Sequence, residues 1–302
     1  MEVKENRIYL FNKKYFYNKY IKKKKNGKIR RIYAPSEELK KIQKDFSTYF
    51  YKINKDIFDE NKYITGFLPE RSIITNASMH LNKDWVINLD IKDFFPNTKE
   101  KYIKNIINKM PKKRFFFIKK HKLVFNNLKE KELLNILCLN GGLPQGSPAS
   151  PILANYVALK FVDPIIQDIL SRVKLDNLSF SRYADDITIS FNGGTRKDAL
   201  DIAKKITKRI KKTPYQIKKE KTKIKHKSQS QIVTGIIVNG SQTRINKKTI
   251  NTMRAILYNL FKENKKADEK IIGMLKFIES VNKDQYNKLI KNIGEREWKL
   301  LK

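Results

Sequence analysis

The stretch SRYADDITIS, residues 181–190, decides the fold of this chain. It holds two adjacent carboxylates, Asp185 and Asp186, between strand-like runs that place the pair at or near the tip of a hairpin. Crowded carboxylates repel and raise each other's pKa unless a cation joins them. By itself the pair fits a cation site and an ordinary solvated turn equally, so the rest of the chain has to decide between them.

A third carboxylate, Asp90, lies in the stretch DWVINLDIKDFF at 84–95. Its apolar neighbours predict a buried strand over this stretch, and Pro96 is expected to end it. A buried charge without a partner is costly, so Asp90 needs either backbone N–H groups or a cation. Two Mg²⁺ ions held by Asp90, Asp185 and Asp186 would meet that need. Such ions, about 4 Å apart, activate an attacking hydroxyl and stabilise a departing pyrophosphate, which is polymerase chemistry.

The charge of the chain indicates a polyanionic partner. Lys and Arg total 66 against 30 Asp and Glu, which gives a formal net charge of +36 over 302 residues. Runs such as 22–25 and 218–227 are interleaved with Tyr, Phe and Ile. An extended nucleic-acid track driven by counterion release explains this balance, and a Lys- and Asn-rich background composition is the alternative. Charge alone names no reaction.

Hydropathy and cysteine content exclude several classes of protein. No apolar run approaches the roughly 20 residues of a membrane span, and the start MEVKENRIYL lacks the apolar core of a signal peptide. Cys138 is the single cysteine, so neither an internal disulfide nor a thiolate zinc site is available. We expect a cytoplasmic protein without a membrane partner.

The expected elements mix helices and strands without strict alternation, which is typical of an α+β fold. Ser36 can cap a helix, and Asn239-Gly240 within 231–245 is a strong signal for a hairpin turn. Helical spacing predicts one helix with a face of Leu39, Ile42, Phe46 and Tyr49, and another with a face of Ala199, Ile202, Ile206 and Ile210. Further helices are expected at about 99–139, at 152–162 and from about 247 onward.

The order of the carboxylate strand, the loop GGLPQGSPASP at 141–151 and the YADD hairpin resembles the reverse transcriptase family, over about 27–245. The resemblance implies a right-hand polymerase fold with fingers, palm and thumb. It places the fingers at 1–85, the palm at 86–235 with a helical insertion at about 99–140, and a primer-grip hairpin with a helical thumb at 236–302.

The resemblance also assigns the metal site and its surroundings. Asp90, Asp185 and Asp186 match the catalytic carboxylates that hold two Mg²⁺ ions, and Ile91 offers its backbone carbonyl to metal. Tyr183 is expected near the primer end. The structural alternatives stay open, namely backbone N–H partners for Asp90 and an ordinary solvated turn for Asp185 and Asp186.

Four residues match positions around the incoming deoxynucleoside triphosphate. Phe95 matches the gate that crowds a ribose 2′-hydroxyl, although a plain core aromatic is the alternative. Gln145 matches a glutamine beside the nucleotide, in a loop that Gly146 lets approach other backbone. Arg71 resembles a triphosphate clamp, although Glu70 departs from the usual small or basic residue before it. Lys221 resembles a lysine that protonates pyrophosphate.

Two shorter patterns narrow the family to bacterial retron reverse transcriptases. Residues 76–80 match the NAxxH signature through Asn76 and His80, and Val233-Thr234-Gly235 matches the VTG signature. Both are expected to bind RNA or primer, and for His80 a core histidine is the alternative.

Retron resemblance implies a cognate structured non-coding RNA that serves as template and primer. It also implies an RNA–DNA hybrid product with a 2′,5′ linkage, a possible effector protein and a role in phage defence. Other bacterial reverse transcriptases stay open, namely group II intron-like, diversity-generating and abortive-infection types. A non-catalytic RNA-binding protein on the same fold is a further alternative.

Overall fold

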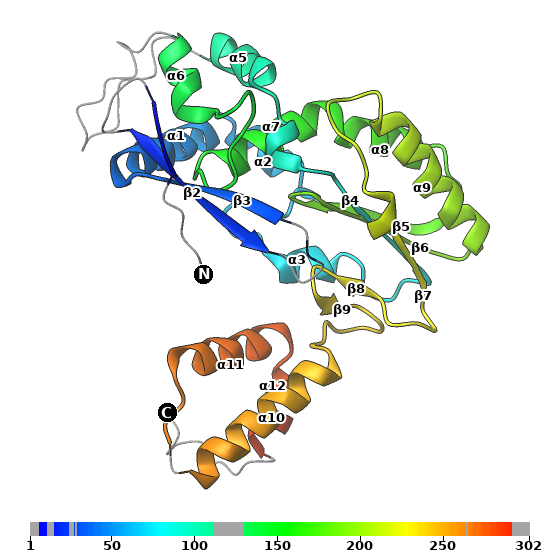
Figure 1. Ribbon diagram of the computed structural model, residues 1–302. Coiled ribbons are helices and arrows are strands. Elements are labelled where there is room, and N and C mark those ends of the chain that lie inside the picture. Colours follow the sequence, from blue (N-terminus) through cyan, green and yellow to red (C-terminus); the bar gives the residue numbers. More distant parts are fainter. Residues whose placement is uncertain are drawn as a thin grey trace.

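The computed structural model describes residues 6–10, 15–23, 27, 29–110, 130–263 and 265–291 (Figure 1). Parts of the predicted fingers at 1–5, of the insertion at 111–129 and of the thumb at 292–302 lie outside the described residues. No helix in the described ranges has both the length and the apolar character needed to cross a bilayer.

A four-stranded antiparallel sheet, in the order β5-β6-β4-β7, forms the centre of the chain. Its strands are β4 (Trp85–Asp90), β5 (Asp176–Tyr183), β6 (Asp186–Asn192) and β7 (Lys223–His226). The predicted strand-turn-strand around YADD is therefore confirmed. In register, Asp90 pairs with Asp186 and Ile87 pairs with Ile189.

The strand predicted over 84–95 is shorter than expected. It ends at Asp90, and the chain then turns through Asp93, at φ 45°, into the short helix α4 (Phe94–Asn97). Pro96 lies inside this helical turn and does not end the strand. A proline is tolerated there because the first turn of a helix has no partner for its missing N–H.

The two faces of the sheet differ in chemistry, because successive side chains of a strand point to opposite faces. One face is apolar and fully buried, with Ile87, Leu89, Ile187, Ile189 and Phe191. The helices α7 (Ser150–Phe161), α8 (Asp163–Leu170) and α9 (Arg196–Ile210) pack with it in one core (Figure 1). The predicted apolar faces of α7 and α9 are buried as expected.

The other face of the sheet is mostly polar and opens toward α3 (Ile73–Ser78) and a two-stranded hairpin. The hairpin strands are β8 (Ile232–Val233) and β9 (Ile236–Ile237). On this side of the sheet lies a second apolar cluster. Val86 is the one residue of β4 among its buried members, and Ala77 of α3 also belongs to it. This cluster continues into the C-terminal helices.

Two turns follow one another here. Thr234 and Gly235, at φ 46° and 87°, connect β8 to β9. Asn239-Gly240, predicted as a hairpin turn, lies in the next connection, between Ile237 and Arg244, which form an antiparallel bridge. A type I′ hairpin turn needs positive φ at both central positions, which Asn-Gly usually supplies. Here Thr234 and Gly235 adopt that conformation, so the VTG signature ends β8 at Val233 and forms the turn with its other two residues.

The N-terminal part holds a three-stranded antiparallel sheet of β1 (Asn6–Tyr9), β2 (Phe16–Lys23) and β3 (Ile29–Pro35). The helices α1 (Glu37–Ile53) and α2 (Lys55–Glu60) follow. Ser36 Oγ accepts a hydrogen bond from Leu39 N at 3.4 Å, so the predicted cap is confirmed. The predicted face is buried at Leu39, Ile42 and Phe46.

Two helices of the predicted insertion are described, α5 (Glu100–Lys109) and α6 (Glu130–Leu137). Cys138, directly after α6, is buried, and burial raises the pKa of its thiol to about 12. The predicted C-terminal helices are α10 (Lys247–Lys262), α11 (Glu269–Val281) and α12 (Lys283–Lys291). Their apolar cluster includes Val233, so it crosses the predicted boundary at 235/236, and the domain limits stay a prediction.

A buried ion pair fixes the strand that leads to YADD. Arg182 and Asp163 have no exposed side-chain surface. Both oxygens of Asp163 accept from the guanidinium, from Nε and Nη2, at 2.7 Å each. Arg182 Nη1 also donates to Asn155 Oδ1 at 2.8 Å. The pair therefore ties β5 to α7 and α8.

Asp163→Asn should lower the free energy of unfolding by about 3–5 kcal/mol, because it leaves a buried guanidinium without its counter-charge. Asp168→Asn is the matched control on the same helix, since Asp168 pairs with Arg172 and Arg209 at the surface. It should cost less than about 1 kcal/mol. Urea denaturation measures both values, and equal losses would contradict this account of the pair.

Candidate active site

The sheet brings two of the predicted carboxylates together. Asp90 and Asp186 are direct cross-strand partners, so their side chains leave the same face with Cβ atoms about 4.5–5.5 Å apart. Asp185 lies beside them at the tip of the hairpin, where Ala184 has φ 56°. Ile91 N donates to Asp185 O at 2.8 Å, which fixes the tip to the end of β4.

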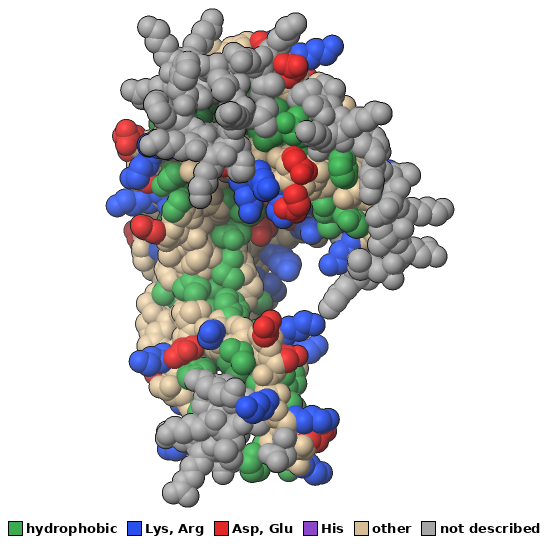
Figure 2. All heavy atoms as spheres, turned by 90° about the vertical axis from the view of Figure 1, so that its left-hand side faces the viewer, with side chains coloured by type: hydrophobic (Ala, Val, Ile, Leu, Met, Phe, Trp, Pro, Cys, Tyr) green, Lys and Arg blue, Asp and Glu red, His purple; other side chains and the backbone are tan. Residues whose placement is uncertain are grey.

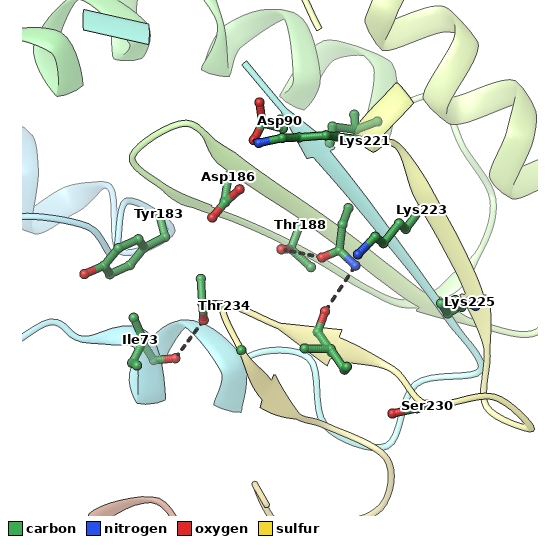
Figure 3. Close-up of a pocket in the computed structure, with 14 residues that line it drawn as sticks. Ile73, Asp90, Tyr183, Asp186, Thr188, Lys221, Lys223, Lys225, Ser230 and Thr234 are labelled. Atoms are coloured by element: carbon green, nitrogen blue, oxygen red, sulfur yellow. Dashed lines mark hydrogen bonds and ion pairs between the residues drawn. The ribbon is translucent and has the colours of Figure 1, made fainter. Parts of the chain in front are cut away.

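Two lysines neutralise Asp90. Lys218 Nζ lies 2.8 Å from Asp90 Oδ1, and Lys221 Nζ lies 2.5 Å from Asp90 Oδ2 (Figure 3). Oδ1 is buried, and its contact with Lys218 is an ion pair. Lys218 was not singled out from the sequence, because a single cation cannot be recognised within such a basic run.

The pKa values of the other two carboxylates are raised. Burial raises the pKa of Asp186 to about 6, and the neighbouring Asp185 and Asp90 contribute. Burial also raises the pKa of Asp185, with Asp90 again adding to the rise. Asp186 opens onto the cleft, yet the cleft walls surround it closely enough to desolvate it. A cation at this place would favour the ionised forms.

The donor set suits a hard divalent cation, although it is not preassembled. Across the described ranges, no three His, Cys, Asp or Glu side chains are grouped as a metal site. Asp90 is turned toward Lys218 and Lys221. Carboxylate and carbonyl oxygens are nevertheless the ligands that Mg²⁺ prefers. Asp90, Ile91, Asp185 and Asp186 would hold it, with the metal displacing the lysines from Asp90.

Asp90 and Asp186 line a cleft of about 710 Å³ between the polar face of the sheet and the β8–β9 hairpin, and Asp185 is not part of this lining (Figure 3). It is lined by the predicted residues Asp90, Asp186, Tyr183, Lys221, Thr234 and Gly235. Lys223 and Lys225 of β7 add positive charge to its wall. Figure 2 shows further Lys and Arg side chains gathered around a hollow in the face that it draws. The cleft therefore suits a polyanion.

An aromatic row runs from the predicted gate to the YADD turn. The ring centroids of Phe67 lie 6.3 Å from Phe95 and 6.0 Å from Tyr183. Phe67 is 47% exposed and has φ 60°. Phe67 was not predicted from the sequence as a site residue. Its position directly after Gly66, in a turn, was the available signal.

The predicted loop around Gln145 packs against the N-terminal sheet. Tyr33 N donates to Gln145 O at 2.7 Å. A Cβ on Gly146 would lie 2.4 Å from Tyr33 O, so the expectation that this glycine allows close backbone approach is confirmed. Gln145 is half-buried and does not line the cleft described above.

The other predicted residues lie away from the cleft. Arg71 donates to the backbone carbonyls of Phe58, Asn61 and Ile64 at 2.6 to 3.0 Å, so it holds the loop before α3. Its role as a triphosphate clamp stays a prediction. Asn76, His80 and Val233 are buried with no exposed surface, which leaves them none to offer RNA directly.

Comparison with known proteins identifies the family. Residues 21–244 match the family model described as reverse transcriptase (RNA-dependent DNA polymerase). The chain belongs to the reverse transcriptase family, has its right-hand polymerase fold and is an RNA-directed DNA polymerase. Enzymes of this family generally use divalent metal ions and an RNA template.

The similar proteins specify the type. The chain is 28% identical to the retron Ec86 reverse transcriptase of Escherichia coli, over 97% of this chain and 85% of that protein. It is 30% identical to the retron Se72 reverse transcriptase of Salmonella heidelberg, over 78% of this chain but only 58% of that protein. Together with the NAxxH and VTG signatures, these relatives make it a reverse transcriptase of the bacterial retron type.

Two solved telomerases are among the structures to which this chain shows low similarity. Telomerase from Candida albicans matches with a TM-score of 0.49 and 13% identity over 90% of this chain. Telomerase from Candida tropicalis matches with a TM-score of 0.48 and 11% identity over 76%. In both cases the match covers 54% of the telomerase chain.

Lys218→Gln should tighten Mg²⁺ binding about fivefold, because it removes an ammonium group that competes with metal for Asp90. Isothermal titration calorimetry at fixed ionic strength measures this. Lys227→Gln is the matched control, since Lys227 pairs with Asp84 at the other end of β4. Unchanged or weaker Mg²⁺ binding in Lys218→Gln would show that the lysine does not stand in the metal's place.

Proposed function

We propose that this enzyme copies part of a cognate structured RNA into DNA by two-metal catalysis at Asp90, Asp185 and Asp186. The observation that carries the proposal is the pairing of Asp90 with Asp186 across β4 and β6, next to the tip that holds Asp185. When bound, two Mg²⁺ ions would activate the primer hydroxyl and stabilise the leaving pyrophosphate. The residues around them bind and orient the substrates.

The nucleotide side of the site would combine Lys221 in the cleft with Phe95, Gln145 and Arg71 outside its lining. Phe95, in line with Phe67 and Tyr183, would crowd a ribose 2′-hydroxyl and so favour deoxynucleotides. Lys221, once released from Asp90, would reach the leaving phosphate as a proton donor. In the structure, the hydrogen bond to Asp90 raises the pKa of Lys221. Gln145 and Arg71 would support the nucleotide from the fingers, Arg71 either by its guanidinium or through the loop that it holds.

The nucleic-acid side is formed by the hairpin and the C-terminal helices. The Thr234-Gly235 turn lines the cleft beside Tyr183 and would contact the primer end. The helix α10 reads KKTINTMRAILYNLFK and carries no acidic residue, while Tyr258 and Phe261 on it are 62% and 45% exposed. A-form RNA offers shape, phosphates and 2′-hydroxyls to such a surface. We infer that these helices select the cognate RNA.

The retron type adds the product and its biological role. Priming would start from an internal 2′-hydroxyl of the RNA, so the DNA would remain joined to RNA by a 2′,5′ linkage. The names of the similar proteins carry the assignment to retrons. A role in phage defence with an effector protein follows from the same assignment.

Asp185→Asn should reduce primer extension about 100-fold or more, a loss of about 2.7 kcal/mol in transition-state stabilisation. RNA affinity should stay within about twofold, because it comes from dispersed lysines. Extension assays and filter binding separate the two effects. Asp176→Asn, an exposed carboxylate at the start of β5, is the matched control and should extend normally. Extension by Asp185→Asn within tenfold of the unmodified enzyme would refute the metal-ligand role.

Expression of this protein with its own locus should yield one dominant structured RNA on the purified enzyme. DNA attached to that RNA should resist separation by denaturation and be released by an enzyme that cleaves 2′,5′ linkages. Sequencing before and after this treatment is the measurement. A random mixture of cellular RNAs, or DNA with only free ends, would contradict the retron product while leaving the polymerase assignment unaffected.

A further inference from the structure

A chain of buried polar side chains connects the two signatures of the sequence. It runs through Ser190, His80, Ser181, Asn76 and Thr234, and we call it the buried polar chain. His80 Nδ1 and Nε2 lie 2.7 Å from Ser190 Oγ and Ser181 Oγ. Ser181 Oγ lies 2.7 Å from Asn76 Oδ1, and Asn76 Nδ2 lies 3.3 Å from Thr234 Oγ1. The first four of these residues have no exposed surface.

The hydrogen bonds of this chain run in one direction. Thr234 Oγ1 donates to Ile73 O at 3.1 Å, so it accepts from the amide of Asn76. Asn76 Oδ1 then accepts from Ser181, and the Ser181 hydroxyl can accept only from His80 Nε2–H. If the Asn76 amide were reversed, its oxygen would face Thr234 and would have to accept a hydrogen bond from the Thr234 hydroxyl. That hydroxyl has a single proton, so its bond to Ile73 O would be lost.

The direction fixes a single state of His80. Nε2 carries the proton and Nδ1 accepts from Ser190. Burial lowers the pKa of His80 to about 3, with Lys83 contributing, so the ring is neutral at any pH at which the enzyme works. A neutral imidazole with one defined tautomer is a rigid connector between β5 and β6.

The chain ends at the wall of the cleft. Thr234 and Gly235 line it together with Asp186 and Tyr183. A second link holds the other end of β8, where Asn88 Nδ2 donates to Ile232 O at 3.2 Å (Figure 3). The turn is therefore tied to the catalytic sheet on both sides, by Asn88 directly and by Asn76 through the buried polar chain.

We propose that Asn76 and His80 are positioning residues that set the Thr234-Gly235 turn, and with it the end of the primer strand, relative to Asp186. This inference rests on the proposed polymerase cleft. It gives both signatures one physical role, in which the NAxxH residues act through the VTG turn and do not touch nucleic acid. The expected consequence of breaking the chain is a misplaced primer end, with the nucleotide site unchanged.

Ser181→Ala tests this, because Ser181 is fully buried and cannot contact nucleic acid itself. It should raise the apparent KM for primer-template about fivefold. The KM for deoxynucleotides, and kcat at saturating primer-template, should stay within twofold. Gln43→Met is the matched control, since Gln43 Nε2 makes another buried bond, to Ile136 O at 2.7 Å, between α1 and α6 and outside the cleft. It should leave all three constants within twofold at a similar loss of thermal stability.

A double variant tests the connection. If Ser181 acts through Thr234, Ser181→Ala combined with Thr234→Val should raise the primer-template KM no more than the larger single effect. Multiplied effects would mean separate roles and overturn the proposal. Nitrogen NMR of His80 should show the Nε2–H tautomer from pH 5 to 8, and the Nδ1–H tautomer would overturn the direction of the chain.

The outcomes separate this inference from the proposed function. If the unmodified enzyme extends primers and Ser181→Ala behaves like Gln43→Met, the positioning role fails alone. Equal changes in both KM values and in kcat would mean that the buried polar chain only stabilises the fold, and would overturn the positioning role too. If the unmodified enzyme extends no primer, the proposed function fails, and the positioning role fails with it.

Discussion

The register between β4 and β6 is the constraint on which the rest of the structure depends. Six cross-strand pairs run from Trp85 opposite Phe191 to Asp90 opposite Asp186. Because side chains alternate along a strand, a slip by one residue would turn Asp90 into the apolar core and Ile87 into the cleft. The burial of Ile87 and its neighbours against α7 to α9 thus holds the carboxylates outward. Apolar packing on one face of the sheet therefore determines that Asp90 and Asp186 lie on the opposite face, in the cleft.

Local signals in the sequence were enough for much of this arrangement. The cap at Ser36, the apolar faces of the helices and the YADD hairpin all follow from residues within one turn or one strand of each other. The position of Asp90 within an apolar strand was also readable, because a charge there needs a partner. The end of that strand was not, since Pro96 is equally compatible with a strand end and a first helical turn.

What the sequence could not supply is the partners of residues far apart in the chain. Lys218 is one lysine among many until the fold brings it to Asp90, 128 positions away. Arg71 resembles a triphosphate clamp in the sequence, and only the fold shows that its guanidinium donates to three backbone carbonyls. The β8–β9 turn at Thr234 has no Asn-Gly signal, and that residue is held by Asn76 and Ile73 O, which the sequence alone does not bring together.

The place of Cys138 gives experimenters a convenient starting point. It is the single cysteine of the sequence, and its thiol is buried and protonated at neutral pH. Reactivity toward alkylating reagents follows the exposed thiolate, so this residue should stay unlabelled in the folded enzyme. Cysteines introduced on the surface of α10 and of β2 would then take up fluorophores or spin labels selectively. Spectroscopy could follow opening and closing around bound RNA without first replacing an original residue.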